Sequence, residues 1–221
     1  MTWLISIGLS LAVSIYGTVR LFRSKEALYF KMILCANWCY TAQLIYQLCL
    51  FYCVSQDMPL GDNALSGLGT NAFAAFVFSA NFGPFDQSMD GKPERHNKAR
   101  VFALAAPILF LALTAGLFVV WSDLGHPVAD LAIYMVISAA MFPLCSYYNL
   151  KYLIIRADDE FTRGVKPVNL FSLLFCFGFL GEMYFSILGN ELWLDIFSYA
   201  DMIFSAAMVF AAVWGSKKWR S

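Results

Sequence analysis

Apolar runs of about 20 residues recur along this chain, and an α-helix needs that length to cross the hydrocarbon layer of a membrane. Seven such runs occur, and we expect a membrane-spanning helix in each of them: 3–19, 28–53, 63–82, 101–121, 128–150, 168–188 and 192–214. Only 14% of the 221 residues are charged, whereas a soluble domain has about 25%. The sequence therefore predicts an all-α integral membrane protein in which residues 1–221 form a single polytopic domain.

The distribution of charge predicts how these helices are oriented. All 15 Lys and Arg residues lie in alternate connections, at their borders or in the C-terminal tail, which places them on one side of the membrane. The other side carries only acidic residues: Asp57, Asp62, Asp123, Asp130, Glu191 and Asp195. Because basic residues favour the cytoplasmic side, we expect the N-terminus outside and the C-terminus in the cytoplasm, in the plasma or inner membrane. The basic residues near the first run, Arg20 and Arg23, follow it, so we do not expect a cleaved signal peptide.

Two carboxylates lie inside apolar runs, Glu182 in the sixth and Asp201 in the seventh. These runs are antiparallel, so both groups fall at a similar depth, roughly 9 Å and 12–14 Å from the outer border. The runs themselves contain no Lys, Arg or His that could neutralise them, apart from Lys31 near the border of the second run. An acid at this depth must therefore be protonated, or be neutralised by a cation or by water. This pattern indicates a site for protons, metal ions or an organic cation that faces the outer side, and the alternative is a structural pair of neutral acids.

Further polar side chains are spaced so that they share a face with, or lie beside, the two acids. In the second run Gln43 and Gln47 share one helix face with Asn37 and Tyr40. We expect these amides to form the polar wall of a cavity, although interhelical hydrogen bonds would explain them equally well. The residues predicted to bind a solute or ion are Glu182, Asp201, Gln43, Gln47, Asn71, Ser198 and Ser205.

No metal site or cofactor is predicted. The cysteine stripe of the second run, formed by Cys35, Cys39, Cys49 and Cys53, has no His or carboxylate beside it, so packing explains it better than metal binding. The lack of a Lys deep inside a run argues against a retinal pigment, which needs one to form the Schiff base. Haem held by two histidines is excluded because His96 and His126 are expected in loops.

A weak internal similarity predicts a repeat. The segment Phe76–Gly83 (FVFSANFG) resembles Met208–Gly215 (MVFAAVWG). The first three helices and the last three would then be parallel repeats joined by the fourth helix, a 3+1+3 plan that occurs in transporters.

The function favoured by these features is transport of a small solute or ion, linked to protons or cations through the intramembrane carboxylates. The expected partners are the lipid bilayer and a small polar or cationic solute, and no nucleic acid is expected. One alternative is a seven-helix sensor, receptor or accessory subunit that binds a cytoplasmic protein through the loop at Asp86–Lys98. Another is an intramembrane lipid hydrolase that uses the two carboxylates as acid and base; only this alternative would make the protein an enzyme.

Overall fold

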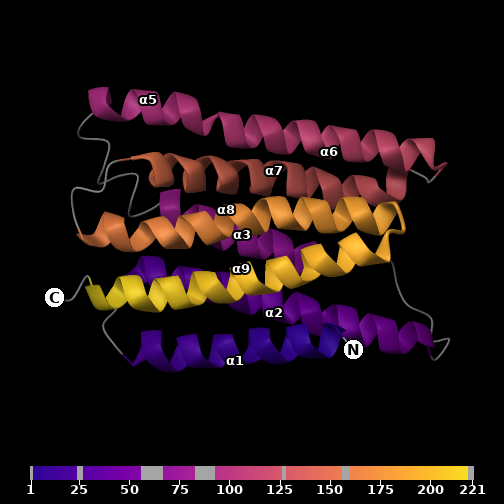
Figure 1. Cartoon of the computed structure of the whole chain (residues 1–221), viewed down its shortest axis with the longest axis horizontal. Coiled ribbons are helices and arrows are strands. Elements are labelled where there is room, and N and C mark those ends of the chain that lie inside the picture. The colour runs from indigo at the N-terminus through magenta and orange to yellow at the C-terminus, as the bar shows by residue number, and fades with distance from the viewer. Residues whose placement is uncertain are drawn as a thin grey trace.

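The computed structural model describes residues 2–23, 27–55, 67–82, 93–125, 128–155 and 160–218. These residues are almost entirely helical and contain no strand, as predicted (Figure 1). The helices are α1 (Thr2–Phe22), α2 (Leu28–Ser55), α3 (Leu68–Ala80), α5 (Pro93–Ala103), α6 (Ala105–Asp123), α7 (Val128–Ile154), α8 (Glu160–Ile187) and α9 (Glu191–Lys218).

The helices lie side by side along one axis and alternate in direction, with the two termini at opposite ends of the bundle (Figure 1). Helices α5 and α6 form one rod that is interrupted at Leu104. Pro107 explains the interruption, because it has no N–H to donate to the carbonyl of Ala103 and is tolerated only in a first turn. The alternation places the described Lys and Arg residues at or near the end of the bundle that holds the C-terminus.

Four helices of the described part are long and apolar enough to cross a membrane, namely those containing Leu4–Phe22, Asn97–Asp123, Thr162–Ile187 and Glu191–Lys217. Their outward faces are apolar as well; α6, for example, exposes Ile108, Leu109 and Val119. Such a surface suits contact with lipid tails. Helix α3 is apolar but shorter, and α2 and α7 belong to the same bundle. That all seven runs cross the membrane stays a prediction.

The described parts of two connections that were expected to be loops are helical, so the expectation of a loop was wrong for these residues. Helix α5 begins at Pro93, so His96 and the second half of the segment Asp86–Lys98 lie on a helix. Helix α8 begins at Glu160 and continues through Pro167, which removes one backbone hydrogen bond without ending the helix. The remainder of Asp86–Lys98, together with His126, Asp57 and Asp62, lies outside the described residues.

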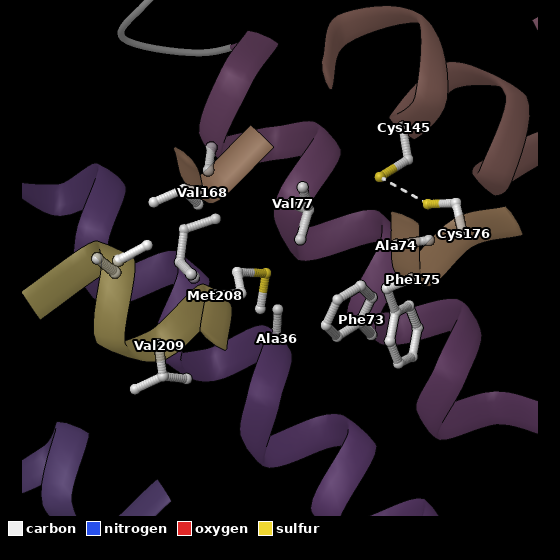
Figure 2. Packing of buried hydrophobic residues seen from close by; sticks show 14 of the residues in the cluster. Ala36, Phe73, Ala74, Val77, Cys145, Val168, Phe175, Cys176, Met208 and Val209 are labelled. Atoms are coloured by element: carbon white, nitrogen blue, oxygen red, sulfur yellow. Dashed lines mark hydrogen bonds between the residues drawn. The ribbon is translucent and has the colours of Figure 1, made fainter. Parts of the chain in front are cut away.

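The helices contact one another in the order α1–α2–α3–α7–α8–α9 and back to α1, while the α5–α6 rod packs outside against α7 and α8. The most extensive of these contacts joins α8 and α9, where Gly164 and Gly215 bring the two backbones together. Buried aromatic and aliphatic side chains fill the centre, including Phe73, Phe175 and Met208 (Figure 2).

Candidate functional site

The candidate site is formed where Glu182 of α8 meets Asp201 of α9. Their carboxyl groups lie within hydrogen-bonding range of each other. Ser198 donates a hydrogen bond of 2.6 Å from Oγ to Oε1 of Glu182. Asp201 is completely buried, and no hydroxyl, amide or backbone N–H of the described residues donates to either of its carboxylate oxygens. Within the described part of the chain, Glu182 is therefore the one available hydrogen-bond partner of Asp201.

This arrangement requires a positive species. Two ionised carboxylates can only accept hydrogen bonds, so a bond between them exists only when one carries a proton. At this distance two negative charges in an apolar setting repel each other strongly. Neither carboxylate forms an ion pair with a Lys, Arg or His of the described ranges. The pair can therefore share a proton or coordinate a small cation, but it cannot hold two uncompensated charges.

A tight turn sets the register that brings the two acids together. Gly189 ends α8 with a left-handed backbone conformation, φ 65°, which glycine adopts without strain. The next residue, Asn190, caps α9 by accepting a 3.3 Å hydrogen bond at Oδ1 from the backbone N–H of Trp193. With the two helices antiparallel and in close contact, Glu182 and Asp201 come to the same level.

Two glycines of α8 give α9 the space that this contact needs. A Cβ at Gly178 would overlap the carboxylate of Asp201, and a Cβ at Gly181 would overlap the ring of Phe197. A larger residue at either position would therefore displace the side chain of Asp201 or Phe197, or α9 itself. Gly178 lies one helical turn before Glu182, so the same face of α8 supplies both the acid and the space beside it.

A small cavity of about 40 Å³ reaches Glu182 of the pair, whereas Asp201 is not among its lining residues. It is lined by residues of α1, α2, α8 and α9: Ser6, Tyr40, Leu44, Glu182, Leu194, Asp195 and Ser198. A water molecule needs a cavity of about 10–15 Å³ on this measure. The cavity therefore has room for a few water molecules or a dehydrated ion, and it is too small for a sugar or an amino acid.

A larger groove of about 500 Å³ lies on the neighbouring side of α8. Its lining from α6, α8 and α9 is almost entirely apolar and contains neither acid: Ala112, Leu113, Gly116, Leu117, Val120, Phe177, Leu180, Gly181, Tyr184 and Phe197. Gly181 and Phe197 belong to this groove, whereas their neighbours Glu182 and Ser198 line the small cavity. The polar chemistry is thus confined to the smaller space.

The predicted amides lie elsewhere in the bundle. Gln43 accepts a 3.0 Å hydrogen bond at Oε1 from the backbone N–H of Gly69, which ties α2 to α3. Asn71 donates from Nδ2 to the carbonyl of Gly67, at 3.1 Å. Gln47 is half-buried, and neither it nor Gln43 nor Asn71 is among the residues that line the cavity. Of the predicted residues the structure gathers Glu182, Asp201 and Ser198, and solute binding by the amides stays a prediction.

Ser205 belongs to a buried polar network instead of the acid pair. Its Oγ donates to Oδ1 of Asn37 at 2.8 Å, and Nδ2 of Asn37 donates to Oγ of Ser14 at 2.7 Å. Thr41 joins the network through hydroxyl hydrogen bonds to Ser14 at 3.0 Å and to Ser10 at 2.7 Å. The network links α1, α2 and α9.

The first helix was not predicted to contribute to the site, yet it provides Ser6 to the cavity and Ser10 and Ser14 to the network. The spacing of four residues between these serines places them on one helix face. That spacing was the sequence signal for an inward-facing polar stripe.

No group of three or more His, Cys, Asp or Glu side chains that could hold a metal ion occurs in the ranges that the structure describes. Comparison with known proteins assigns no relative: no family model, no curated protein and no solved structure matches this chain. The function must therefore be argued from the chemistry of the site itself.

Proposed function

We propose that this protein is an ion transporter of the plasma or inner membrane, in which the Glu182–Asp201 pair binds a proton or a monovalent cation. The observation that carries the proposal is a fully buried aspartate, Asp201, whose one hydrogen-bonding neighbour among the described residues is a second acid, Glu182, which lines a small cavity. Burying such a pair costs stability, and intramembrane acids are typical of proton and cation pathways. A binding function explains why the acids occupy positions where apolar side chains would be more stable.

The size and composition of the site favour an ion over a larger solute. The cavity of about 40 Å³ excludes organic solutes, and its polar groups are carboxylates and hydroxyls. Oxygen ligands of this kind suit hard cations. The exposed acid Asp195 also lines the cavity, and its negative charge would raise the local concentration of cations.

The same side of the bundle that carries the cavity also carries the described acids Asp123 and Glu191. The basic residues lie at the opposite end. By the positive-inside rule the cavity then faces the outside, so the ion would enter the pair from that side.

The pattern of contacts between the helices supports the proposed repeat. A two-fold relation between α1–α3 and α7–α9 pairs the α1–α2 contact with α7–α8, and the α2–α3 contact with α8–α9. It also pairs the α3–α7 contact with α9–α1, and all of these contacts occur. Such a relation between two halves, with a site between them, is a common plan for transporters.

Flux measurements test the proposal. The purified protein is reconstituted into liposomes that contain a pH- or sodium-sensitive dye, and an ion gradient is imposed. We expect ion flux with the wild type and a loss of about tenfold or more in Asp201→Asn and in Glu182→Gln, because each substitution removes a charge-bearing ligand. The matched control is Asp123→Asn, an exposed acid at the same end of the bundle, which should keep the wild-type rate. Flux no greater than in protein-free liposomes, or flux indifferent to both substitutions, would refute the transport function.

A further inference from the structure

A second buried polar site lies toward the other end of the bundle, where three asparagines meet. Nδ2 of Asn81 donates to Oδ1 of Asn149 at 3.1 Å and to Oδ1 of Asn169 at 2.9 Å. Asn81 lies in the π-helical turn after α3, Asn149 on α7 and Asn169 on α8. All three side chains are completely buried. We call these three residues the amide cluster.

Other polar side chains surround the amide cluster. The hydroxyl of Tyr29 donates to Oδ1 of Asn169 at 3.3 Å, and Nδ2 of Asn149 donates to Oγ of Ser172 at 2.8 Å. The thiols of Cys145 and Cys176 lie beside them with a sulfur–sulfur distance of 3.8 Å (Figure 2). Helices α2, α7 and α8 and the turn after α3 therefore converge on one polar patch inside an apolar bundle.

Two atoms of the amide cluster lack a hydrogen-bond partner in the described part of the chain. They are Oδ1 of Asn81, an acceptor, and Nδ2 of Asn169, a donor. Buried amide groups are rarely left unpaired, because their desolvation is then uncompensated. One water molecule can donate to the first atom and accept from the second. The two free atoms thus match the hydrogen-bonding capacity of water.

Helix α8 contributes a residue to both polar sites. Between Asn169 and Glu182 it carries Ser172, Phe175 and Gly178, and this row winds around the helix, so that the two ends are about 140° apart. At 1.5 Å per residue, Asn169 and Glu182 are separated by roughly 20 Å along the helix axis. The acid pair and the amide cluster are therefore two distinct polar sites at different depths in the bundle.

Three aromatic rings separate the two sites. Phe73 and Phe175 are buried side by side with their ring centroids 4.1 Å apart (Figure 2). Tyr40, which lines the outer cavity, packs against Phe175 at 5.0 Å and against Phe73 at 6.5 Å. We call Tyr40, Phe73 and Phe175 the aromatic barrier. The apolar rings of Phe73 and Phe175 are in contact, so an ion could not pass between them in this arrangement.

We propose that the amide cluster binds water and forms a second, uncharged station for the ion that the acid pair takes up. This inference rests on the proposed transport function. Amide and hydroxyl oxygens can replace part of the hydration shell of a monovalent cation, but they bind it more weakly than carboxylates do. This weaker binding favours release of the ion on the cytoplasmic side.

The water site can be tested without any transport assay. Hydroxyl radicals produced from bound water by an X-ray pulse oxidise the side chains next to that water, and mass spectrometry locates them. We expect oxidation of Tyr29 and Cys176 in the wild type, although Tyr29 is fully buried, and much less oxidation in Asn81→Leu and Asn169→Leu. The control is Thr114→Val, which alters a buried hydroxyl that bonds only to its own helix. A wild type without oxidation of Tyr29 and Cys176 would overturn the proposal, even if the leucine variants failed to fold.

The role of the amide cluster in transport has a separate test. In Asn169→Leu, sodium or potassium ions should still raise the melting temperature of the protein, because they bind at the acid pair. Its ion flux should fall by about tenfold or more, because a buried polar ligand is lost. Flux within twofold of the wild type would refute the second station and leave the acid site untouched. If the wild type shows no ion flux but Tyr29 and Cys176 are oxidised, the transport function is refuted and the water site is retained.

Discussion

Asp201 can lie against the backbone of α8 because residue 178 is a glycine. Any Cβ at this position would overlap the Asp201 carboxylate, so the acid pair depends on a missing side chain as much as on the two acids. The same backbone approach brings Asp201 within range of Glu182, one turn further along α8. The site is therefore sensitive to substitutions that change no charge.

Gly178→Ala should disrupt the acid pair, because the new methyl group must displace Asp201 or the whole of α9. We expect a lower melting temperature in detergent and loss of ion flux. The matched control is Gly116→Ala in α6, where an added Cβ meets open space. Alanine is favoured over glycine in a helix by about 0.5–1 kcal/mol, so this control should be neutral or stabilising. Equal effects of the two substitutions would contradict the close contact between Gly178 and Asp201.

Asp201→Asn should abolish cation binding without lowering the stability of the protein. The substitution removes a buried ionisable group, so the melting temperature in cation-free buffer should stay the same or rise. Sodium or potassium ions should stabilise the wild type at alkaline pH by RT ln(1 + [L]/Kd), which is about 2.7 kcal/mol at 100 times Kd. At acidic pH protons compete for the pair, so this stabilisation should shrink.

The variant Asp201→Asn should show no such cation effect. Choline chloride at equal ionic strength controls for charge screening, because its cation exceeds the cavity. The idea fails if choline stabilises the wild type as much as sodium and potassium do.

Ser205→Ala should destabilise the bundle. It leaves Oδ1 of Asn37 buried without the 2.8 Å hydrogen bond that it now accepts, which costs about 1–3 kcal/mol. Ser216→Ala is the matched control, because Ser216 is also buried on α9 and bonds only to the carbonyl of Val213 in its own helix. Thermal unfolding of both variants in detergent provides the comparison. If Ser216→Ala lowers the stability of the protein as much as Ser205→Ala does, this result would argue against the interhelical network.

The orientation of the chain can be measured directly. A reporter that is active only in the cytoplasm, fused after Ser221, should be active, because the basic residues gather at the end of the bundle that holds the C-terminus (Figure 1). A reporter that requires an extracytoplasmic location should be inactive at the same position. The opposite pair of results would place the acid cavity on the cytoplasmic side and reverse the proposed entry route.

Some of the site could be predicted from the sequence. The helical rise and the antiparallel direction of two consecutive runs predict a similar depth for Glu182 and Asp201, and the structure places the two groups in contact. Ser198 precedes Asp201 by three residues and shares its helix face. The hydrogen bond from Ser198 to Glu182 instead of Asp201 could not be predicted, because it depends on how far α9 is rotated against α8.

The contacts of the polar residues on the other helices could not be predicted from the sequence. Gln43 shares a helix face with Tyr40, yet Tyr40 lines the cavity while Gln43 bonds to Gly69 of α3. The asparagines of the amide cluster come from segments far apart in the chain, and no periodicity within one helix connects them.

The sequence alone determined that this chain forms apolar helices long enough for a membrane, which helices carry acids and where the basic residues gather. These properties are local, since helix length, hydropathy and charge are read within one segment at a time. The tertiary structure decided which polar groups meet: Glu182 with Asp201, Ser205 with Asn37, and Asn81 with Asn169. Those pairings depend on the rotation and spacing of neighbouring helices, which are set by side-chain packing across the whole bundle, down to a single glycine beside Asp201.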